Sequence, residues 1–201
     1  LEFSVGQMAA LREEARGLGL RWGVSCWDVG SVEDMTGVRP DFLKVASACL
    51  TDRPLLEAYR QAGVPIYLST GMSTWAEVDQ AVAWTQPVVV LHCHSAYPSP
   101  IEELNLSMIP VLRARYGRTT GYSSHTVSPG PALMAAVCGA EVIEVHVTED
   151  RALWGSDQAA SLEPKAVAKL VEEIRTWEAA RGTTEKRVMP AEEVQKAKLR
   201  R

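Results

Sequence analysis

Short apolar runs alternate with amphipathic stretches along most of this chain. The apolar runs favour strands, and the stretches with apolar residues three and four positions apart favour helices. The predicted strands cover 20–25, 42–46, 65–69, 87–93, 119–122 and 141–147. The predicted helices cover 4–19, 31–35, 54–62, 74–85, 102–115, 129–138 and 164–180. Such an alternation predicts an α/β fold with parallel strands joined by right-handed crossovers.

Polar residues follow almost every predicted strand, as Ser69 and Thr70 do after the third. The glycine-rich phosphate turns GxGxxG and GxxxxGK[ST], typical of open doubly wound sheets, do not occur. Polar groups contributed by many strand ends are typical of a (β/α)8 barrel site. Only about six βα units are visible, so we expect an incomplete TIM barrel over 1–182. The polar stretch 183–201 is predicted to be a charged linker or helix.

Composition narrows the class of protein. Hydrophobic residues make up 46% of the 201 residues and charged residues 23%, as in ordinary globular domains. The net charge of −4 argues against nucleic-acid or membrane partners, which require a basic surface. Four scattered cysteines without a CxxC motif predict a reducing, cytoplasmic location. The chain begins with leucine, so we expect it to be a fragment, a processed chain or a trimmed one.

The predicted strand 141–147 carries a candidate catalytic residue, Glu144, and a candidate metal ligand, His146. Alternation places Glu144 and His146 on one face, which is the interior of a barrel. By the same parity Ser123 and His125 share a face of the preceding strand, so the two imidazoles are expected side by side. Two histidines suit a divalent ion that keeps positions open for water and substrate. The alternative is that each histidine bonds a backbone carbonyl.

Lys44, the second candidate catalytic residue, interrupts the otherwise apolar strand 42–46. A lysine inside a barrel needs an anion, because its desolvation is otherwise uncompensated. The anion is either a phosphate or carboxylate ligand or an internal partner such as Asp28 or Glu144.

Hydroxyl groups recur at the strand ends, and they include Ser47, Ser69 and Ser95. Hydroxyls and N–H groups there bind phosphate oxygens, although ordinary helix capping is the alternative for any single serine. His92 and His94 flank Cys93 too closely to converge on a zinc ion; His92 is predicted to be structural, and His94 is left open.

Several segments occur here in an order that resembles the sialic acid synthase family, the phosphoenolpyruvate-condensing nonulosonate synthases. The similarity runs over nearly the whole chain. The segments are LSTGMS (68–73), LHCHSAYP (91–98), GYSSHT (121–126), IEVHVT (143–148), GSD (155–157) and SLEP (161–164).

The resemblance implies a (β/α)8 barrel, a small antifreeze-like domain and a homodimer. It implies condensation of phosphoenolpyruvate with an N-acylated amino sugar such as N-acetylmannosamine, assisted by Mn²⁺ or Mg²⁺. By resemblance His125 and His146 match the metal ligands, and Glu144 matches a carboxylate beside the metal. The positions that match the substrate pocket are Lys44, Ser25, Ser47, Ser69, Ser95, Tyr97, Ser123 and Asp157.

The chain also departs from the family pattern. Cys49 stands where the family has a glutamate of the sugar site, and Ser124 stands where it has an aspartate. The six predicted strands match family strands three to eight, and the antifreeze-like domain has no counterpart. We therefore expect this chain alone to be inactive or nearly so. The alternatives are a catalytically degenerate sugar- or metal-binding relative, and an unrelated barrel aldolase or hydrolase.

Overall fold

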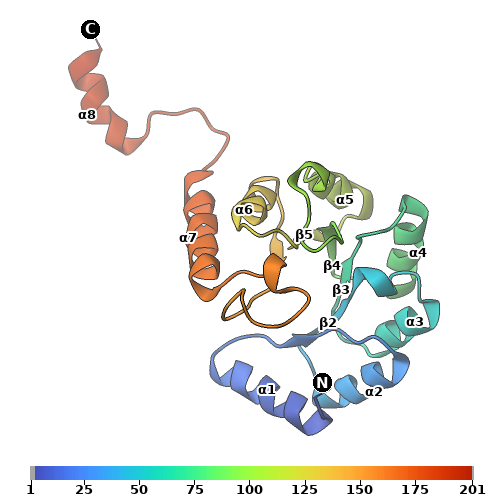
Figure 1. The fold of residues 1–201 in the computed structure, drawn as a ribbon. Helices are drawn as coiled ribbons and strands as arrows, with labels where there is room; N and C mark the ends of the chain where they lie inside the picture. Colours follow the sequence, from blue (N-terminus) through green and yellow to red (C-terminus); the bar gives the residue numbers. More distant parts are fainter. Residues whose placement is uncertain (1–2, 201) are drawn as a thin grey trace.

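The computed structural model describes residues 3–200, and its centre is a curled sheet of six parallel strands (Figure 1). The strands are β1 (Gly23–Val24), β2 (Phe42–Val45), β3 (Ile66–Ser69), β4 (Val89–Cys93), β5 (Thr119–Ser124) and β6 (Val142–Val145). They lie in the sheet in chain order, each paired in parallel with the next. β1 and β6 are therefore the two edges. The predicted incomplete (β/α) barrel is confirmed.

Helices connect the strands and cover the outer side of the sheet (Figure 1). They are α1 (Val5–Gly17), α2 (Val29–Val38), α3 (Arg53–Gln61), α4 (Trp75–Thr85), α5 (Met108–Tyr116), α6 (Gly130–Val137) and α7 (Pro164–Ala180). Local capping explains several starts. Ser4 and Gln7 form a reciprocal capping box at α1, and the Asp28 carboxylate accepts from the Ser31 N–H at α2.

The helix predicted over 102–115 is wrong in its first half. A short 3-10 turn, η2 (Ile101–Glu103), is followed by a loop before α5 begins at Met108. Asn105 has a left-handed backbone with φ of 45°, which ends any helical continuation. Leu104 is buried, and its carbonyl bonds Nε2 of His92 at 2.7 Å. Tertiary anchoring of this turn thus overrides the helical pattern.

The main core lies between the sheet and its helices. Leu43 and Val45 of β2 are fully buried against that side, as is Tyr59 of α3. On the opposite face of β2, the Phe42 ring stacks on Tyr67 with centroids 4.5 Å apart. Gly23 permits this arrangement, since a Cβ there would lie 2.2 Å from the Phe42 ring. Lys44 lies two residues after Phe42, on the same face of β2 as the stacked rings.

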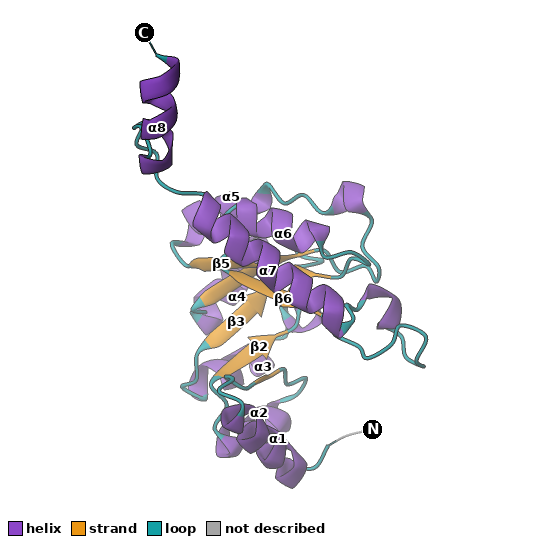
Figure 2. Ribbon diagram, turned by 90° about the vertical axis from the view of Figure 1, so that its left-hand side faces the viewer, coloured by secondary structure: helices purple, strands orange, loops and turns teal. Residues whose placement is uncertain are grey.

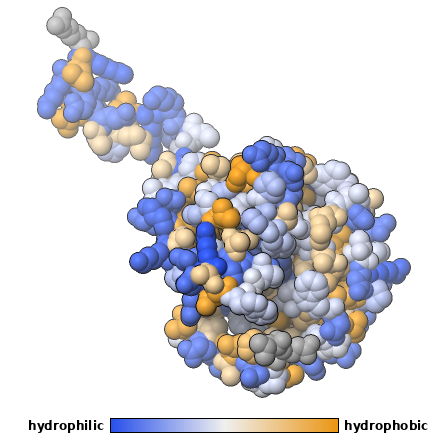
Figure 3. Space-filling model, in the orientation of Figure 1, coloured by the Kyte–Doolittle hydropathy of each residue, from blue (hydrophilic) through white to orange (hydrophobic). Residues whose placement is uncertain are grey.

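The chain beyond α7 leaves the barrel. A connector leads to α8 (Pro190–Leu199), which contains no buried residue and stands away from the body in two perpendicular views (Figures 1 and 2). Its surface mixes polar and apolar side chains, and Val194 and Leu199 are exposed (Figure 3). None of the helices between residues 3 and 200 is both long and apolar enough to cross a membrane.

Candidate active site

The two candidate metal ligands lie next to each other at the carboxyl ends of β5 and β6. The rings of His125 and His146 are nearly perpendicular, and their centroids are 5.2 Å apart. His125 is 3% exposed, whereas the His146 side chain keeps 30% of its surface open to solvent. The adjacency predicted from strand parity is therefore present.

The segment that follows β4 fixes the orientation of His125. Nδ1 of His125 lies 2.7 Å from the His94 carbonyl, which can only accept, so Nδ1 carries the proton. The Tyr97 ring packs on the imidazole with centroids 4.1 Å apart. The carbonyl bond considered as an alternative is thus real. It leaves Nε2 as the lone-pair nitrogen, which is the usual arrangement of a metal-ligating histidine.

His146 has a carboxylate neighbour rather than a carbonyl. Its Nδ1 lies 3.6 Å from Oδ2 of Asp157, which is half-exposed in the loop after β6. Burial lowers the pKa of both His125 and His146, and the neighbouring His125 lowers the pKa of His146 further. Both rings are therefore neutral near pH 7, the protonation state in which imidazole binds a metal.

Lys44 has an internal partner. Its Nζ lies 2.9 Å from Oε1 of Glu144, and the Ser123 hydroxyl donates to the same oxygen at 3.0 Å. Of the two internal partners considered for Lys44, Glu144 is the one observed. Asp28 instead caps α2, where hydrogen bonds from Ser31 lower its pKa.

A second cluster gathers hydroxyl groups around a backbone turn after β3. The Gly71 N–H donates to the Ser47 hydroxyl at 3.0 Å. The Cys93 thiol lies 3.6 Å from the hydroxyls of both Ser47 and Ser95, and 3.9 Å from Nδ1 of His125. Cys93 therefore links the hydroxyl cluster to the imidazole pair. Sequence reasoning missed this role, although Cys93 shares a strand face with Ser95.

Two predicted pocket serines stand apart from these clusters. Ser69 is fully buried, and its hydroxyl finds no hydrogen-bond partner among the described residues. Ser25 is exposed just after β1, at the edge of the sheet opposite β6. Cys49, where the sequence predicts a departure from the family pattern, is buried, and burial raises the pKa of its thiol.

The side chains of His92, on β4, and His94, just after it, bond partners other than His146. His92 bonds the Leu104 carbonyl, which confirms its predicted structural role. His94 pairs with Glu103 at 2.9 Å. Across residues 3–200, no cluster of three or more His, Cys, Asp or Glu side chains is arranged to hold a metal. Within these residues, an ion would therefore be held by the two imidazoles of His125 and His146.

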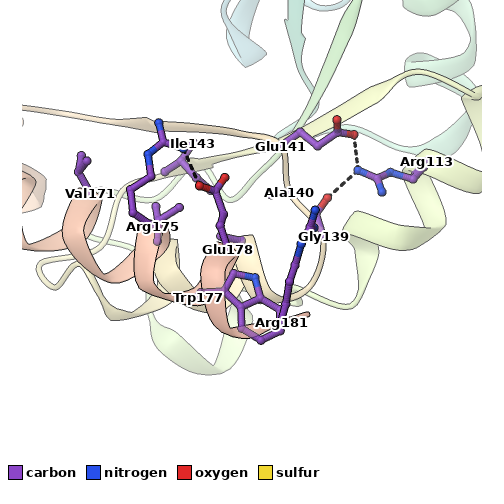
Figure 4. A pocket seen from close by; sticks show the side chains of 12 residues that line it. Arg113, Gly139, Ala140, Glu141, Ile143, Val171, Arg175, Trp177, Glu178 and Arg181 are labelled. Atoms are coloured by element: carbon purple, nitrogen blue, oxygen red, sulfur yellow. Dashed lines mark hydrogen bonds and ion pairs between the residues drawn. The ribbon is translucent and has the colours of Figure 1, made fainter. Parts of the chain in front are cut away.

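A sizeable cavity lies away from these groups. It has a volume of about 640 Å³ and lies between β6, α6 and α7, near the amino end of β6 (Figure 4). Arg113 bonds the Gly139 carbonyl at one side of it, and Arg175 pairs with Glu178 at the other. Barrel sites form at the carboxyl ends of strands, so this cavity is distinct from the candidate active site.

A parallel βα sheet with imidazole, carboxylate, ammonium and hydroxyl groups at its strand ends defines a (β/α)-barrel protein with a polar site. The sequence profile of the NeuB family matches residues 1–186, and the chain belongs to this family. It is 34% identical to N-acetylneuraminate-9-phosphate synthase of Homo sapiens over 197 residues. It is 32% identical to N,N'-diacetyllegionaminic acid synthase of Legionella pneumophila over 196 residues.

A solved structure agrees with this assignment. N-acetylneuraminic acid synthetase from Leptospira borgpetersenii, in complex with citrate, superposes with a TM-score of 0.90 at 32% identity. The match covers all of this chain and 73% of the Leptospira chain. The human and Legionella relatives are matched over 96% and 93% of this chain. The chain spans 55% of the length of each of those two curated relatives.

Proposed function

We propose that this chain supplies most of a site that condenses phosphoenolpyruvate with an N-acylated amino sugar, yielding a nonulosonate and phosphate. The observation that carries the proposal is the convergence of Lys44, Glu144, Ser123, His125 and His146 from three strands. The hydroxyl cluster lies alongside them. Membership of the NeuB family and the synthase names of its relatives support the same reaction class.

The two anionic groups of phosphoenolpyruvate would be held by Lys44 and the hydroxyls of Ser47 and Ser95. Charge-assisted hydrogen bonds of this kind position a ligand and stabilise developing charge. Asp157 and Tyr97, on the rim, would contact an N-acetylmannosamine-like sugar. Ser25, Ser69 and Ser123 remain proposed pocket residues.

His125 and His146 fit a divalent ion such as Mn²⁺ or Mg²⁺, because both imidazoles are neutral. The hydrogen bond from Nδ1 of His125 to the His94 carbonyl also leaves Nε2 free to bind the ion. When bound, the ion would act as a Lewis acid on the sugar aldehyde. The enol carbon of phosphoenolpyruvate attacks the aldehyde carbon, and the aldehyde oxygen takes up a proton to become a hydroxyl group. Water then adds to the cationic carbon, and Glu144 takes the proton that this water loses. The bond between that carbon and the phosphate oxygen breaks, phosphate leaves, and the new hydroxyl loses its proton to become the keto group.

The same proposal covers organisation and location. Residues 183–201 form a connector beyond the barrel domain of residues 1–182, in keeping with the absence of buried residues in α8. The protein acts as a homodimer in the cytoplasm. Its four cysteines are free thiols, as expected in a reducing compartment.

Metal titration tests the imidazole pair directly. Mn²⁺ affinity should fall at least about tenfold in His146→Ala and in His125→Ala, since each loses a ligand. His94→Gln is the matched control, because that imidazole pairs with Glu103 instead. Equal binding by all variants would remove the metal site.

Turnover tests the reaction. Phosphate release from phosphoenolpyruvate is measured with Mn²⁺ and N-acetylmannosamine, for this chain and for a version extended at both ends to the length of its relatives. We expect release by the longer protein and little by this chain. Release by neither would refute the proposed reaction.

A further inference from the structure

The positive charge of Lys44 is already matched by a carboxylate of this chain. Lys44 stands on β2 and Glu144 on β6, and three strands separate them in the sheet. Their ion pair at 2.9 Å therefore crosses the hollow of the curled sheet. A phosphate or carboxylate that reached the same ammonium would meet Glu144 in its place.

The pair is accessible enough to exchange partners. The side chains of Lys44 and Glu144 are 20% and 30% exposed, so water reaches both. A fully buried pair would resist separation, because breaking it strands a desolvated charge. Partly exposed pairs contribute far less and are screened by salt. Both Lys44 and Ser123 bind the same oxygen, Oε1, so one movement of the carboxylate releases both contacts.

Glu144 also lies one step below the imidazole pair. It precedes His146 by two residues on the same strand face, and its partner Ser123 precedes His125 by two residues on β5. Two residues of strand correspond to about 7 Å. A carboxylate released from Lys44 would therefore add negative charge close to both imidazoles.

We propose that Glu144 is an internal counter-ion which an incoming substrate anion displaces from Lys44. Displacement frees its negative charge to act on a cation held by His125 and His146. Anion and divalent cation therefore bind with positive coupling, and by linkage each raises the affinity of the other equally. The identity of the anion as phosphoenolpyruvate rests on the proposed function, whereas the displacement itself applies to any phosphate.

The test compares Glu144→Gln with Glu141→Gln by calorimetry, using inorganic phosphate and then phosphoenolpyruvate without metal. Both variants remove one negative charge, but Glu141 pairs with Arg113 at the opposite end of the barrel. We expect Glu144→Gln to bind either anion at least about tenfold more tightly than wild type, or about 1.4 kcal/mol. Glu141→Gln should match wild type, and Lys44→Met should lose the gain when combined with Glu144→Gln.

A second measurement follows the coupling. Mn²⁺ affinity is determined with and without phosphoenolpyruvate; the wild type should gain affinity with the anion, and Glu144→Gln should not. Ser123→Ala, which loosens the carboxylate but keeps its charge, should bind anions with intermediate affinity and guards against a folding defect in Glu144→Gln.

The outcomes separate the two claims. Anion affinity of Glu144→Gln equal to or below that of Glu141→Gln, including no binding by either, would overturn the internal counter-ion. A gain for inorganic phosphate, with phosphoenolpyruvate bound no better than phosphate by any variant, would support the counter-ion and count against the proposed substrate.

Discussion

Removing one hydroxyl group, in Tyr59→Phe, should destabilise the fold more than its size suggests. Tyr59 is fully buried on α3, and its hydroxyl accepts from the Cys26 N–H at 2.7 Å. The same hydroxyl faces the carbonyls of Cys26 and Lys44, each 2.9 Å away. It thereby ties α3 to the ends of β1 and β2. Burial raises the pKa of the Tyr59 phenol above its ordinary value, and the hydrogen bond with the Cys26 backbone offsets only part of that rise.

The expected magnitude follows from these contacts. Phenylalanine fills nearly the same volume, so no large cavity forms. The buried Cys26 N–H loses its acceptor, which costs about 1–3 kcal/mol, and the donated bond adds roughly 1 kcal/mol. The total of about 2–4 kcal/mol corresponds to a fall in Tm of roughly 5–15 °C for a chain of this size.

Urea and thermal unfolding measure the change, and the chain contains a matched control. Tyr122 is also fully buried, but its hydroxyl has no hydrogen-bond partner among the residues described. Tyr122→Phe should therefore leave stability unchanged or raise it slightly. The hydrogen-bond argument is refuted if the loss in free energy of unfolding for Tyr59→Phe exceeds that for Tyr122→Phe by less than about 1 kcal/mol.

Three further outcomes can be measured. Without metal, the free energy of unfolding should fall as pH drops below about 6.5, because the pKa values of His125 and His146 are lowered in the folded protein and the unfolded chain binds more protons. Urea unfolding at pH 7 and pH 5 should show a smaller fall for the variant that combines His125→Gln with His146→Gln. Gly71→Ala should weaken phosphate binding in calorimetry by about 10–100-fold at nearly unchanged Tm, because its Cβ would come within 2.2 Å of the Ser95 hydroxyl; unchanged affinity would show that the hydroxyl cluster binds no anion. Hydrogen bonds from Arg115 and Tyr116 lower the pKa of Asp79 to about 2, so the contribution of this carboxylate to stability should be lost between about pH 4 and 2. Acid unfolding of Asp79→Asn should lack this part of the pH dependence.

The sequence predicts the parts of this fold that follow from periodicity. Alternation along 141–147 places Glu144 and His146 on one face, and the structure brings His146 beside His125. Strand positions agree because buried parallel strands are apolar runs with clear boundaries. The six-stranded arrangement follows from the alternation of elements and needs no long-range information.

Contacts across the hollow of the sheet are beyond pattern analysis. Nothing in the spacing of Lys44 selects Glu144 over Asp28, because the choice depends on how far the sheet curls. Likewise, the start of α5 is set by Leu104, whose burial and bond to His92 are tertiary facts. The role of Cys93 depends on its distances to Ser47 and His125, which follow β2 and β5 and lie far from Cys93 in the sequence.

The position of β6 at an open edge has a consequence for local stability. β4 and β5 share five register pairs, whereas β6 pairs with a full strand on one side only, apart from a single bridge between Val147 and Leu162 just beyond its end, and none of its residues is fully buried. Edge elements of this kind open at a free-energy cost below that of global unfolding. Such an opening would carry Glu144 and His146 away while β2 to β5 stayed folded. Ligands that contact both β6 and its neighbours would bind only the closed form and would lower the population of the open form. Ligand binding and the local stability of this edge are therefore thermodynamically linked.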